Sequence, residues 1–361
     1  MKTVDGKTSR DKALHLEVGE FVVVGVDVHK KNWHLAVWSM KRGLVTHWVQ
    51  PASAATLIER LDPVRTHISW IGYEAGPTGF GLARALKAAH LNVWVVAPSR
   101  VPKLPGRENK TDRLDCIKLA KLIAEKQIVH PVCIPSEQEE ADRQVLRMRA
   151  TVSRKLGKVK VQIKSFLLLH GIAEPEGLRG WSRRSLQALR EVPMNTELRM
   201  CLDALLEELN EHAVRLRKLN AGVRALARTE RHQSTVTNLC TVPGVGLLTA
   251  MTVRTEWIQP ERFTDSAQVA RLIGLAPSIR QSGQSSRSGP IIKSGNARVR
   301  WVLVESAWRS LRLDSTANDR YHRLLRNTAN PKKAIVGVAR QRATCLWRMI
   351  VTGKPYRVAP K

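Results

Sequence analysis

The sequence lacks long apolar segments and paired cysteines, and both absences narrow the class of protein. No apolar run in the 361 residues approaches the roughly 20 that a membrane span needs. Residues 1–20 carry charges but no apolar core or cleavage site, so we expect a flexible tail and not a signal peptide. The five cysteines are odd in number and none lie at metal spacing, which argues against disulfides and zinc and fits a reducing cytoplasm.

Acidic residues are scarce, because 31 Asp and Glu stand against 60 Lys and Arg and give a formal net charge of +29. A globular protein this basic is typical of one that binds a polyanion, since neutralising phosphates releases counterions. Hydrophobic residues make up 43% of the chain, which excludes a disordered tail. The charge predicts nucleic acid and no membrane as partner, but a ribosomal or nucleoid-packing protein would share it.

Residues 21–130 alternate between β-rich and helical patterns, which predicts an α/β domain. Three meandering strands come first, and helices then alternate with strands. This is the order of a mixed RNase H/RuvC-like sheet, although other α/β domains share it. The expected strands are 21–28, 32–39, 43–49, 68–73 and 92–97, and the expected helices are 54–61, 79–89 and 112–125.

Residues 136–230 form two heptad segments on either side of a break near 171–181. This pattern predicts a helical hairpin or coiled-coil arm, and two helices of an ordinary bundle fit it equally. Between Arg143 and Ala173 the sequence has eight Lys and Arg and no acid, which indicates contact with nucleic acid. The repeated apolar residues are Val145, Val152, Val159 and Phe166 with Leu156 and Ile163, then Leu198, Leu205, Leu219 and Leu226 with Leu202, Leu209, Leu216 and Val223.

Residues 235–350 predict a mainly helical C-terminal domain with phosphate-binding loops. The segment Thr241–Gly246 resembles a helix-hairpin-helix turn, whose backbone N–H groups bind phosphate, although a plain turn is the alternative. A Ser/Gly-rich loop spans 282–289, and Ser266–Val304 holds six Lys and Arg without an acid. Two tryptophans seven apart, Trp301 and Trp308, indicate core packing. The predicted nucleic-acid contacts here are Gly244, Gly246, Arg280, Gly283, Arg287, Lys293, Arg298 and Arg300.

Four acids in the first domain indicate a metal site. Asp27 ends an apolar strand, Glu74 follows the fourth strand, and Asp112 and Asp115 share one side of the next helix. In an RNase H-like sheet the first and fourth strands are neighbours, and the final helix packs across their ends, so the four carboxylates would converge. Such oxygen clusters hold Mg²⁺, with Mn²⁺ as the alternative, and two metals can promote phosphoryl transfer.

Two of these acids also have a purely structural explanation. Asp112 could cap the helix that begins beside it, and Asp115 could pair with Lys118 or Arg113. The basic loop that ends at Lys110 could guide a nucleic-acid strand to the acids or could simply be solvated. Only the combination of four ordered acids, the fold order and the basic charge favours catalysis.

The acid-bearing segments resemble the DEDD motifs of an insertion-sequence transposase family related to Piv DNA invertases. The segments are Val26–Lys30 (VDVHK), Tyr73–Gly79 (YEAGPTG) and Lys110–Asp115 (KTDRLD). The resemblance implies a RuvC-like domain in which Asp27, Glu74, Asp112 and Asp115 are catalytic and hold metal. Cys116 stands where the family has a small residue.

The C-terminal segments resemble the second domain of the same family. They are the PGVG turn, Phe263, Gly274–Pro277 (GLAP), Ser282 with Gly283, and Lys293–Asn296 followed by Arg298–Arg300, so that the resemblance covers residues 21–350. It implies that Ser282 is a catalytic nucleophile that links covalently to DNA, although Ser285, Ser286 and Ser288 lie close by. It also implies an element-encoded bridge RNA, a dimer or tetramer, and a bacterial cytoplasmic or nucleoid location.

These observations lead to one prediction and two alternatives. The prediction is a transposase or site-specific DNA recombinase in which metal-assisted attack by a serine cuts and rejoins DNA. A serine hydroxyl needs activation, and a metal of the DEDD domain, in the same or another subunit, would supply it. The first alternative is a RuvC-like Mg²⁺-dependent endonuclease that uses water. The second is a non-catalytic nucleic-acid-binding scaffold.

Overall fold

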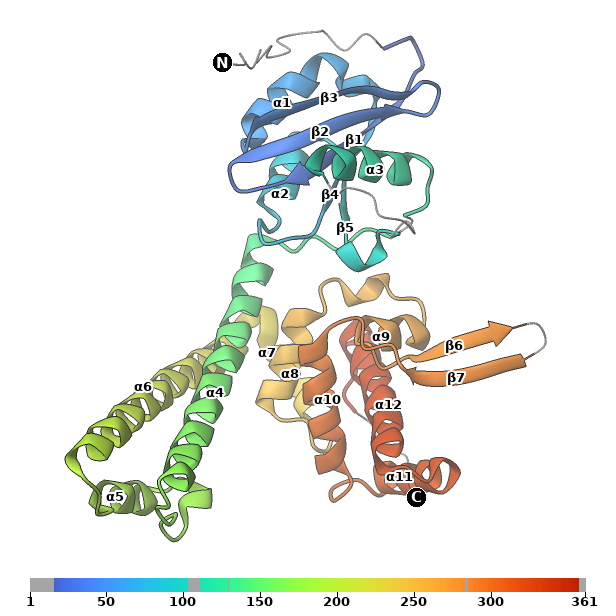
Figure 1. Ribbon diagram of the computed structural model, residues 1–361. Coiled ribbons are helices and arrows are strands. Elements are labelled where there is room, and N and C mark those ends of the chain that lie inside the picture. The colour runs from blue at the N-terminus through green and yellow to red at the C-terminus, as the bar shows by residue number, and fades with distance from the viewer. Residues whose placement is uncertain (1–15, 103–110, 129, 283–284, 357–361) are drawn as a thin grey trace. The chain divides into compact units, whose positions relative to one another are not determined.

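A computed structural model describes residues 16–102, 111–128, 130–282 and 285–356, without the side chains of 279–288 (Figure 1). Lys110 and Gly283 therefore lie outside the described residues. The chain divides into two compact units, residues 1–136 and 137–361, and each is described by itself. Among the described residues, no helix combines the length and the apolar character that a membrane crossing requires.

The first unit is built on a mixed five-stranded sheet with the order β3-β2-β1-β4-β5. β2 runs antiparallel to both β1 and β3, whereas β4 runs parallel to both β1 and β5. This is the RNase H-like order that the sequence predicts, so the predicted fold class is confirmed. The strands are β1 (Val22–Val28), β2 (Asn32–Ser39), β3 (Gly43–Pro51), β4 (Ile68–Glu74) and β5 (Val93–Val96).

Helices cover the two faces of this sheet unequally. Val22, Val24 and Val26 of β1 pack with leucines of α1 (Ala54–Leu61) and α2 (Gly81–Ala88). The alternate residue Val23 packs instead with Leu119 of α3 (Asp112–Ala124), which crosses the other face (Figure 1). Because side chains alternate along a strand, every second residue of β1 faces α3. Two short 3₁₀ turns, Asp62–His67 and Pro98–Arg100, complete the unit.

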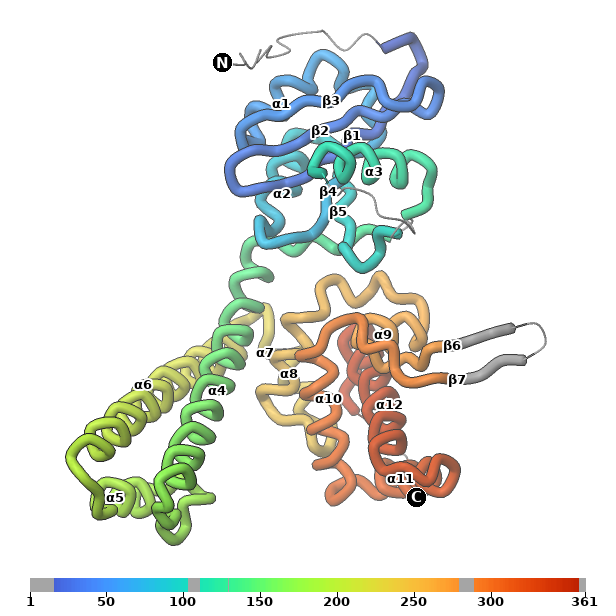
Figure 2. The backbone as a smooth tube through the Cα atoms, in the orientation of Figure 1, coloured from blue at the N-terminus to red at the C-terminus, as the bar shows by residue number. Residues whose placement is uncertain are grey.

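The second unit begins with two long helices that pack along each other (Figure 2). They are α4 (Glu137–Leu169) and α6 (Thr196–Ala227), and the chain between them forms a 3₁₀ turn, Leu178–Gly180, and α5 (Arg183–Glu191). The predicted heptad residues Val152, Val159, Ile163, Leu202 and Leu209 are buried. The helical arm therefore has a core of its own.

The rest of the second unit is mainly helical around one larger core. Val223 of α6 joins this core together with Trp257, Leu303 and Leu346. The elements are α7 (Glu230–Cys240), α8 (Leu247–Glu256), a 3₁₀ turn (Pro260–Arg262), α9 (Ser266–Leu272), β6 (Pro277–Ser282), β7 (Ser285–Ile291), α10 (Ala297–Ser310), α11 (Ser315–Thr328) and α12 (Pro331–Thr352).

Two sequence-based expectations for this unit are wrong. Residues 282–289 were expected as a loop, but Ser282 belongs to β6 and residues 285–289 belong to β7, because backbone pairing forms there without the apolar alternation that marks most strands. Trp301 and Trp308, expected in the core, are 64% and 42% exposed. The face of α10 that packs on the core is formed by other residues, namely Val299, Val302, Leu303, Ser306, Ala307 and Ser310.

Candidate metal centre and basic loops

Two paired glycines allow α3 to lie directly on the sheet. Gly25 of β1 and Gly72 of β4 are partners in the parallel ladder. A Cβ atom on Gly25 would lie 2.2 Å from the carbonyl oxygen of Cys116, and one on Gly72 would lie 2.0 Å from Cδ1 of Ile123. Gly25 has no room for a larger residue because it meets the helix backbone, whereas at Gly72 the end of the Ile123 side chain would have to move. The glycines therefore fix where α3, with its acids, crosses the strands.

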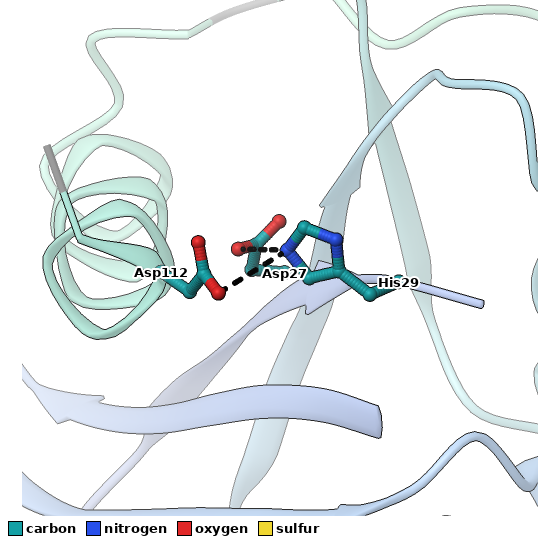
Figure 3. Close-up of side chains that lie close together, drawn as sticks. All are labelled: Asp27, His29 and Asp112. Carbon is teal, nitrogen blue, oxygen red and sulfur yellow. Dashed lines mark hydrogen bonds and ion pairs between the residues drawn. The ribbon is translucent and has the colours of Figure 1, made fainter. Parts of the chain in front are cut away.

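Asp27 and Asp112 meet at the end of β1 that this helix reaches, with His29 between them (Figure 3). Nε2 of His29 lies 3.0 Å from Oδ2 of Asp27 and 3.6 Å from Oδ2 of Asp112. Asp112 begins α3, where Thr111 caps the helix by accepting a hydrogen bond from the backbone N–H of Leu114. The helix N-terminus carries a partial positive charge that favours an acid at this position.

The other two predicted ligands, Glu74 and Asp115, lie in the same region. Glu74 lies two residues after Gly72 on β4, so it shares the face that α3 covers, and it is exposed. Asp115 is partly buried one turn along from Asp112. Among the described residues, the three side chains with ligand atoms within 4.8 Å of one another are Asp27, His29 and Asp112. Glu74 and Asp115 stay predicted ligands.

The donor set fits a divalent cation. Two carboxylates and one imidazole can supply three ligand atoms, and carboxylates gathered without a cation repel one another. These carboxylates also affect the neighbouring thiol of Cys116. Burial, and after it the negative charges of Asp27 and Asp115, raise the pKa of this thiol to about 11. Cys116 is therefore a neutral packing residue beneath Gly25, and Mg²⁺ or Mn²⁺ would be held by the acids.

Three histidines lie near the two acids. The sequence does not predict any of them as a site residue. His34 of β2 is the ladder partner of Asp27, and its Nε2 lies 3.6 Å from Oδ2 of Asp112. On β3, partial burial and then Arg113 and His34 lower the pKa of His47. His29 lies two residues after Asp27, which was the available signal, whereas His34 depends on the strand register.

In the second unit, the glycines of the GLAP and Lys293–Asn296 loops hold these loops together. Gly274 and Gly295 have positive φ angles of 68° and 123°, and a Cβ atom on Gly295 would lie 2.3 Å from the carbonyl oxygen of Leu272. Arg300, a predicted nucleic-acid contact, donates Nη1 to the carbonyls of Ile273 and Lys293 at 2.9 and 3.2 Å. Its guanidinium therefore stabilises the loops.

The predicted helix-hairpin-helix turn lies between α7 and α8. Gly244 has φ of 81°, and a Cβ atom there would lie 2.8 Å from the carbonyl oxygen of Ser306 on α10. Gly246 caps the N-terminus of α8 and has open space around it. Gly244 thus packs on α10, while Gly246 offers the accessible backbone of the turn.

The remaining predicted contacts lie on or near the β6–β7 hairpin. Ser282 ends β6 and pairs with Ser285, and Arg280 pairs with Arg287 across the two strands. Figure 1 shows the hairpin extending away from the helices of its unit. Lys293 and Arg298 are exposed in the chain that follows.

A buried carboxylate links the loops to the arm. Glu256, at the end of α8, accepts hydrogen bonds of 2.8 Å from Nε and Nη2 of Arg147 on α4. It also accepts a 2.8 Å bond from Asn296, which caps α10. Burial alone would raise the pKa of Glu256, but the bonds from Arg147 outweigh it and lower the pKa.

The acid-free stretch of α4 is partly neutralised by residues elsewhere in the unit. Arg147 pairs with Glu256, Arg149 donates to Asn220, and Lys164 lies 2.5 Å from a carboxylate oxygen of Glu174. The side chains of this stretch that remain exposed and basic are Arg154, Lys155 and Lys158. Any contact of this stretch of α4 with nucleic acid would therefore centre on these three residues.

Both units match known transposases. Residues 24–172 match a transposase family named for the acid set DEDD, and residues 236–322 match one described as "Transposase IS116/IS110/IS902 family". A putative transposase of Sinorhizobium fredii is 31% identical over 335 residues, which cover 91% of this chain and 81% of the relative. The transposase for insertion sequence element IS1533 of Leptospira borgpetersenii is 28% identical over 305 residues, covering 80% and 84%.

A third relative shows that the similarity spans both units. The transposase for insertion sequence element IS1111A of Coxiella burnetii is 23% identical over 341 residues, which cover 93% of this chain and 91% of the relative. The sheet order and the two matched regions point to the same assignment. The chain therefore belongs to the IS116/IS110/IS902 family of transposases, enzymes that act on DNA.

Proposed function

We propose that this transposase cuts and rejoins the DNA of its insertion sequence through a phosphoserine link to Ser282, assisted by divalent metal at Asp27, Glu74, Asp112 and Asp115. The observation that carries the proposal is the convergence of Asp27 and Asp112 at one edge of an RNase H-like sheet. Family membership argues against the non-catalytic scaffold. A hydrolytic nuclease that uses water remains the alternative to Ser282.

The acids orient the scissile phosphate and its nucleophile. Mg²⁺ or Mn²⁺, when bound, supplies positive charge for the phosphodiester and for the attacking and leaving oxygens. Asp27 and Asp112 provide carboxylate ligands from a strand and a helix, two rigid elements that hold them in place. The imidazole of His29 offers a nitrogen ligand, so this site favours Mn²⁺ over Mg²⁺ more than a site made only of oxygen ligands would.

In the covalent step, Oγ of Ser282 forms a bond to phosphorus while the bond to one DNA oxygen breaks. The serine loses its proton to solvent as its oxygen attacks, and the departing oxygen takes up a proton and ends as a DNA hydroxyl. Attack by the hydroxyl of another DNA end on the phosphoserine reverses the chemistry and rejoins the strand. A position at the end of β6, on an extending hairpin, supports this role, since it allows the serine to approach bound DNA.

The basic loops would position the DNA. Gly246, Lys293 and Arg298 are accessible for phosphate contacts, and Lys110, Arg280, Gly283 and Arg287 are proposed from the basic, Gly-containing sequence around them. The resemblance also supports an element-encoded guide RNA, a dimeric or tetrameric assembly, and work in the bacterial cytoplasm or nucleoid. The net charge of +29 supports nucleic-acid partners.

A covalent-trapping assay tests the chemistry. The purified protein, Mg²⁺, co-purified RNA and labelled element-end DNA are mixed, denatured and separated on a gel. We expect a protein–DNA adduct that disappears in Ser282→Ala and in Asp27→Ala. Ser285→Ala, which changes the ladder partner of Ser282, is the matched control and should retain the adduct.

The outcomes separate the candidates. Cleavage without an adduct, unchanged in Ser282→Ala, would assign water as the nucleophile and leave a metal-dependent nuclease. If the adduct is lost in Ser285→Ala but kept in Ser282→Ala, the nucleophile is Ser285 on β7 and not Ser282. Cleavage unaffected by Asp27→Ala would remove the metal from the mechanism.

A further inference from the structure

Helix α10 carries two tryptophans on its solvent side. Trp301 is 64% exposed and Trp308 is 42% exposed, although indoles are among the largest apolar side chains. They lie seven residues apart and therefore on the same side of the helix, separated by about 10.5 Å along its axis. Trp308 also contacts Tyr321 of α11, with ring centroids 5.7 Å apart.

Basic side chains lie in line with these indoles. Arg298, Trp301, Glu305 and Trp308 follow one another at spacings of three, four and three residues, so they form a single stripe, and Arg312 follows just after the helix ends. Of these five residues, Arg298 and Arg312 carry the positive charge that attracts a polyanion, and Lys293 and Arg309 are exposed nearby. We name these exposed residues, from Lys293 to Arg312, the α10 face.

We infer that the α10 face is a stacking surface for unpaired bases of a single-stranded nucleic acid. Indoles stack on any base, and flanking guanidiniums bind the phosphates between bases. The axial separation of the two indoles suits bases one or two nucleotides apart on an extended strand. The inference rests on the nucleic-acid binding in the proposed function, and it is independent of Ser282 and of the metal.

The charge of the face argues against the main alternative, a helix of a second copy. Tryptophans at seven-residue spacing could pack in a helical seam. Such a partner would need acids opposite Arg298, Arg309 and Arg312, but the chain has only 31 acids against 60 Lys and Arg. A polyanion meets that requirement and a copy of this chain does not.

The test measures the affinity of the full chain for a fluorescein-labelled oligothymidylate of about 12 nucleotides by fluorescence anisotropy over a salt series. Trp301→Ala should weaken binding about 5- to 150-fold, the range measured for one base–aromatic stack. Trp301→Phe should retain most of the affinity. The slope of log affinity against log salt should not change in Trp301→Ala, because stacking releases no counterions.

Three further arms make the result specific. Arg298→Gln should lower the salt slope by about 0.7, and Glu305→Gln should strengthen binding. An oligonucleotide of the same length with abasic spacers loses stacking on both indoles, so it should bind the unchanged protein no more tightly than the oligothymidylate binds Trp301→Ala. Phe21→Ala, which removes an exposed aromatic side chain from the other unit, is the matched control and should change nothing.

Equal affinity of Trp301→Ala and the unchanged protein would overturn the inference. So would a change in self-association of Trp301→Ala by sedimentation without a change in oligonucleotide affinity, which would assign the face to a second copy. An oligouridylate of equal length shows whether the strand is RNA or DNA, and either preference supports the inference. Ser282→Ala should bind normally, so a failure here is distinguishable from a failure of the proposed chemistry.

Discussion

Carboxylates in the two units of this transposase are neutralised in opposite ways. Of the described residues, only imidazoles form ion pairs with Asp27 and Asp112, and both acids remain accessible. In the second unit the buried acids Asp142 and Glu256 each receive two hydrogen bonds from one arginine. Asp142 binds Arg231 at 2.7 and 2.9 Å and also receives a 2.8 Å bond from His232.

This difference separates acids that stabilise the fold from acids that await a ligand. A buried acid with a bidentate arginine contributes to a unique packing, and removing one partner leaves the other charge buried and unpaired. Acids that gather at an accessible edge without a guanidinium gain little stability from their position. Substitutions in the first group should therefore change stability, whereas substitutions in the second should change activity.

The largest effect should come from Asp27→Asn. We expect DNA cleavage and adduct formation to fall by about a hundred- to a thousandfold, the scale of losing one preorganised electrostatic contact. The melting temperature should stay the same or rise, because the change removes repulsion from Asp112. Cleavage of labelled element-end DNA and thermal unfolding measure both quantities, and a marked fall in melting temperature would erase the contrast with the buried acids.

Glu256→Ala changes one of the buried acids, so its main effect should be on stability. Arg147 would lose its carboxylate partner, and because its side chain is 34% exposed and solvent screens the charge left behind, we expect the free energy of unfolding to fall by about 1.5–3 kcal/mol. Denaturant unfolding measures the change. The double variant Arg147→Leu with Glu256→Met is the control and should recover part of the loss, since no charge is then left buried; no recovery would show that the bond to Asn296 dominates.

Gly25→Ala tests how α3 is positioned. The new methyl group would overlap the carbonyl of Cys116, so we expect a loss of about 1–3 kcal/mol, the usual cost of overpacking. The same variant should bind Mn²⁺ more weakly in a paramagnetic-resonance titration, because Asp112 moves with α3. The matched substitution Gly246→Ala, at a glycine with open space, should leave Mn²⁺ binding unchanged.

The smallest expected effect is a loss of folding stability at low pH. Burial alone would raise the pKa of Asp142, but hydrogen bonds from Arg231, His232 and Gln138 lower it to about 2 from an ordinary 3.8. Because the folded-state pKa is the lower one, the stabilisation is complete above pH 4 and is lost as pH falls toward 2. It amounts to about 2 kcal/mol. Denaturant unfolding across this range should show the loss, and Asp142→Asn should flatten that part of the profile.

The first unit could be predicted closely from its sequence. Alternating apolar residues and short turns give five strands whose observed bounds differ from the expected ones by a few residues at most. Asp27 and Asp112 could be predicted to meet because a carboxylate in an apolar strand needs a partner. The roles of His29 and His34 could not, since they depend on the register between strands and on the angle of a helix.

The second unit was harder to predict because its decisive contacts join distant residues. Arg147 and Glu256 are 109 residues apart, and no local pattern marks either of them as a partner of the other. The seven-residue spacing of Trp301 and Trp308 predicts core packing wrongly, because it defines a helix face without saying which face is buried. Arg300 looked like a phosphate ligand until its carbonyl partners were known.

Gly25 and Gly72, on which α3 packs, make the spacing between each glycine and its acid as important as the identity of the acid. Gly25 precedes Asp27 by two residues, and Gly72 precedes Glu74 by the same interval, so each strand presents its acid just past the point where the helix rests. Inserting or deleting one residue within either interval would turn the acid to the opposite side of the sheet, among the leucines of α1 and α2. The number of residues between glycine and acid thus places each carboxylate as firmly as the fold of the strand itself.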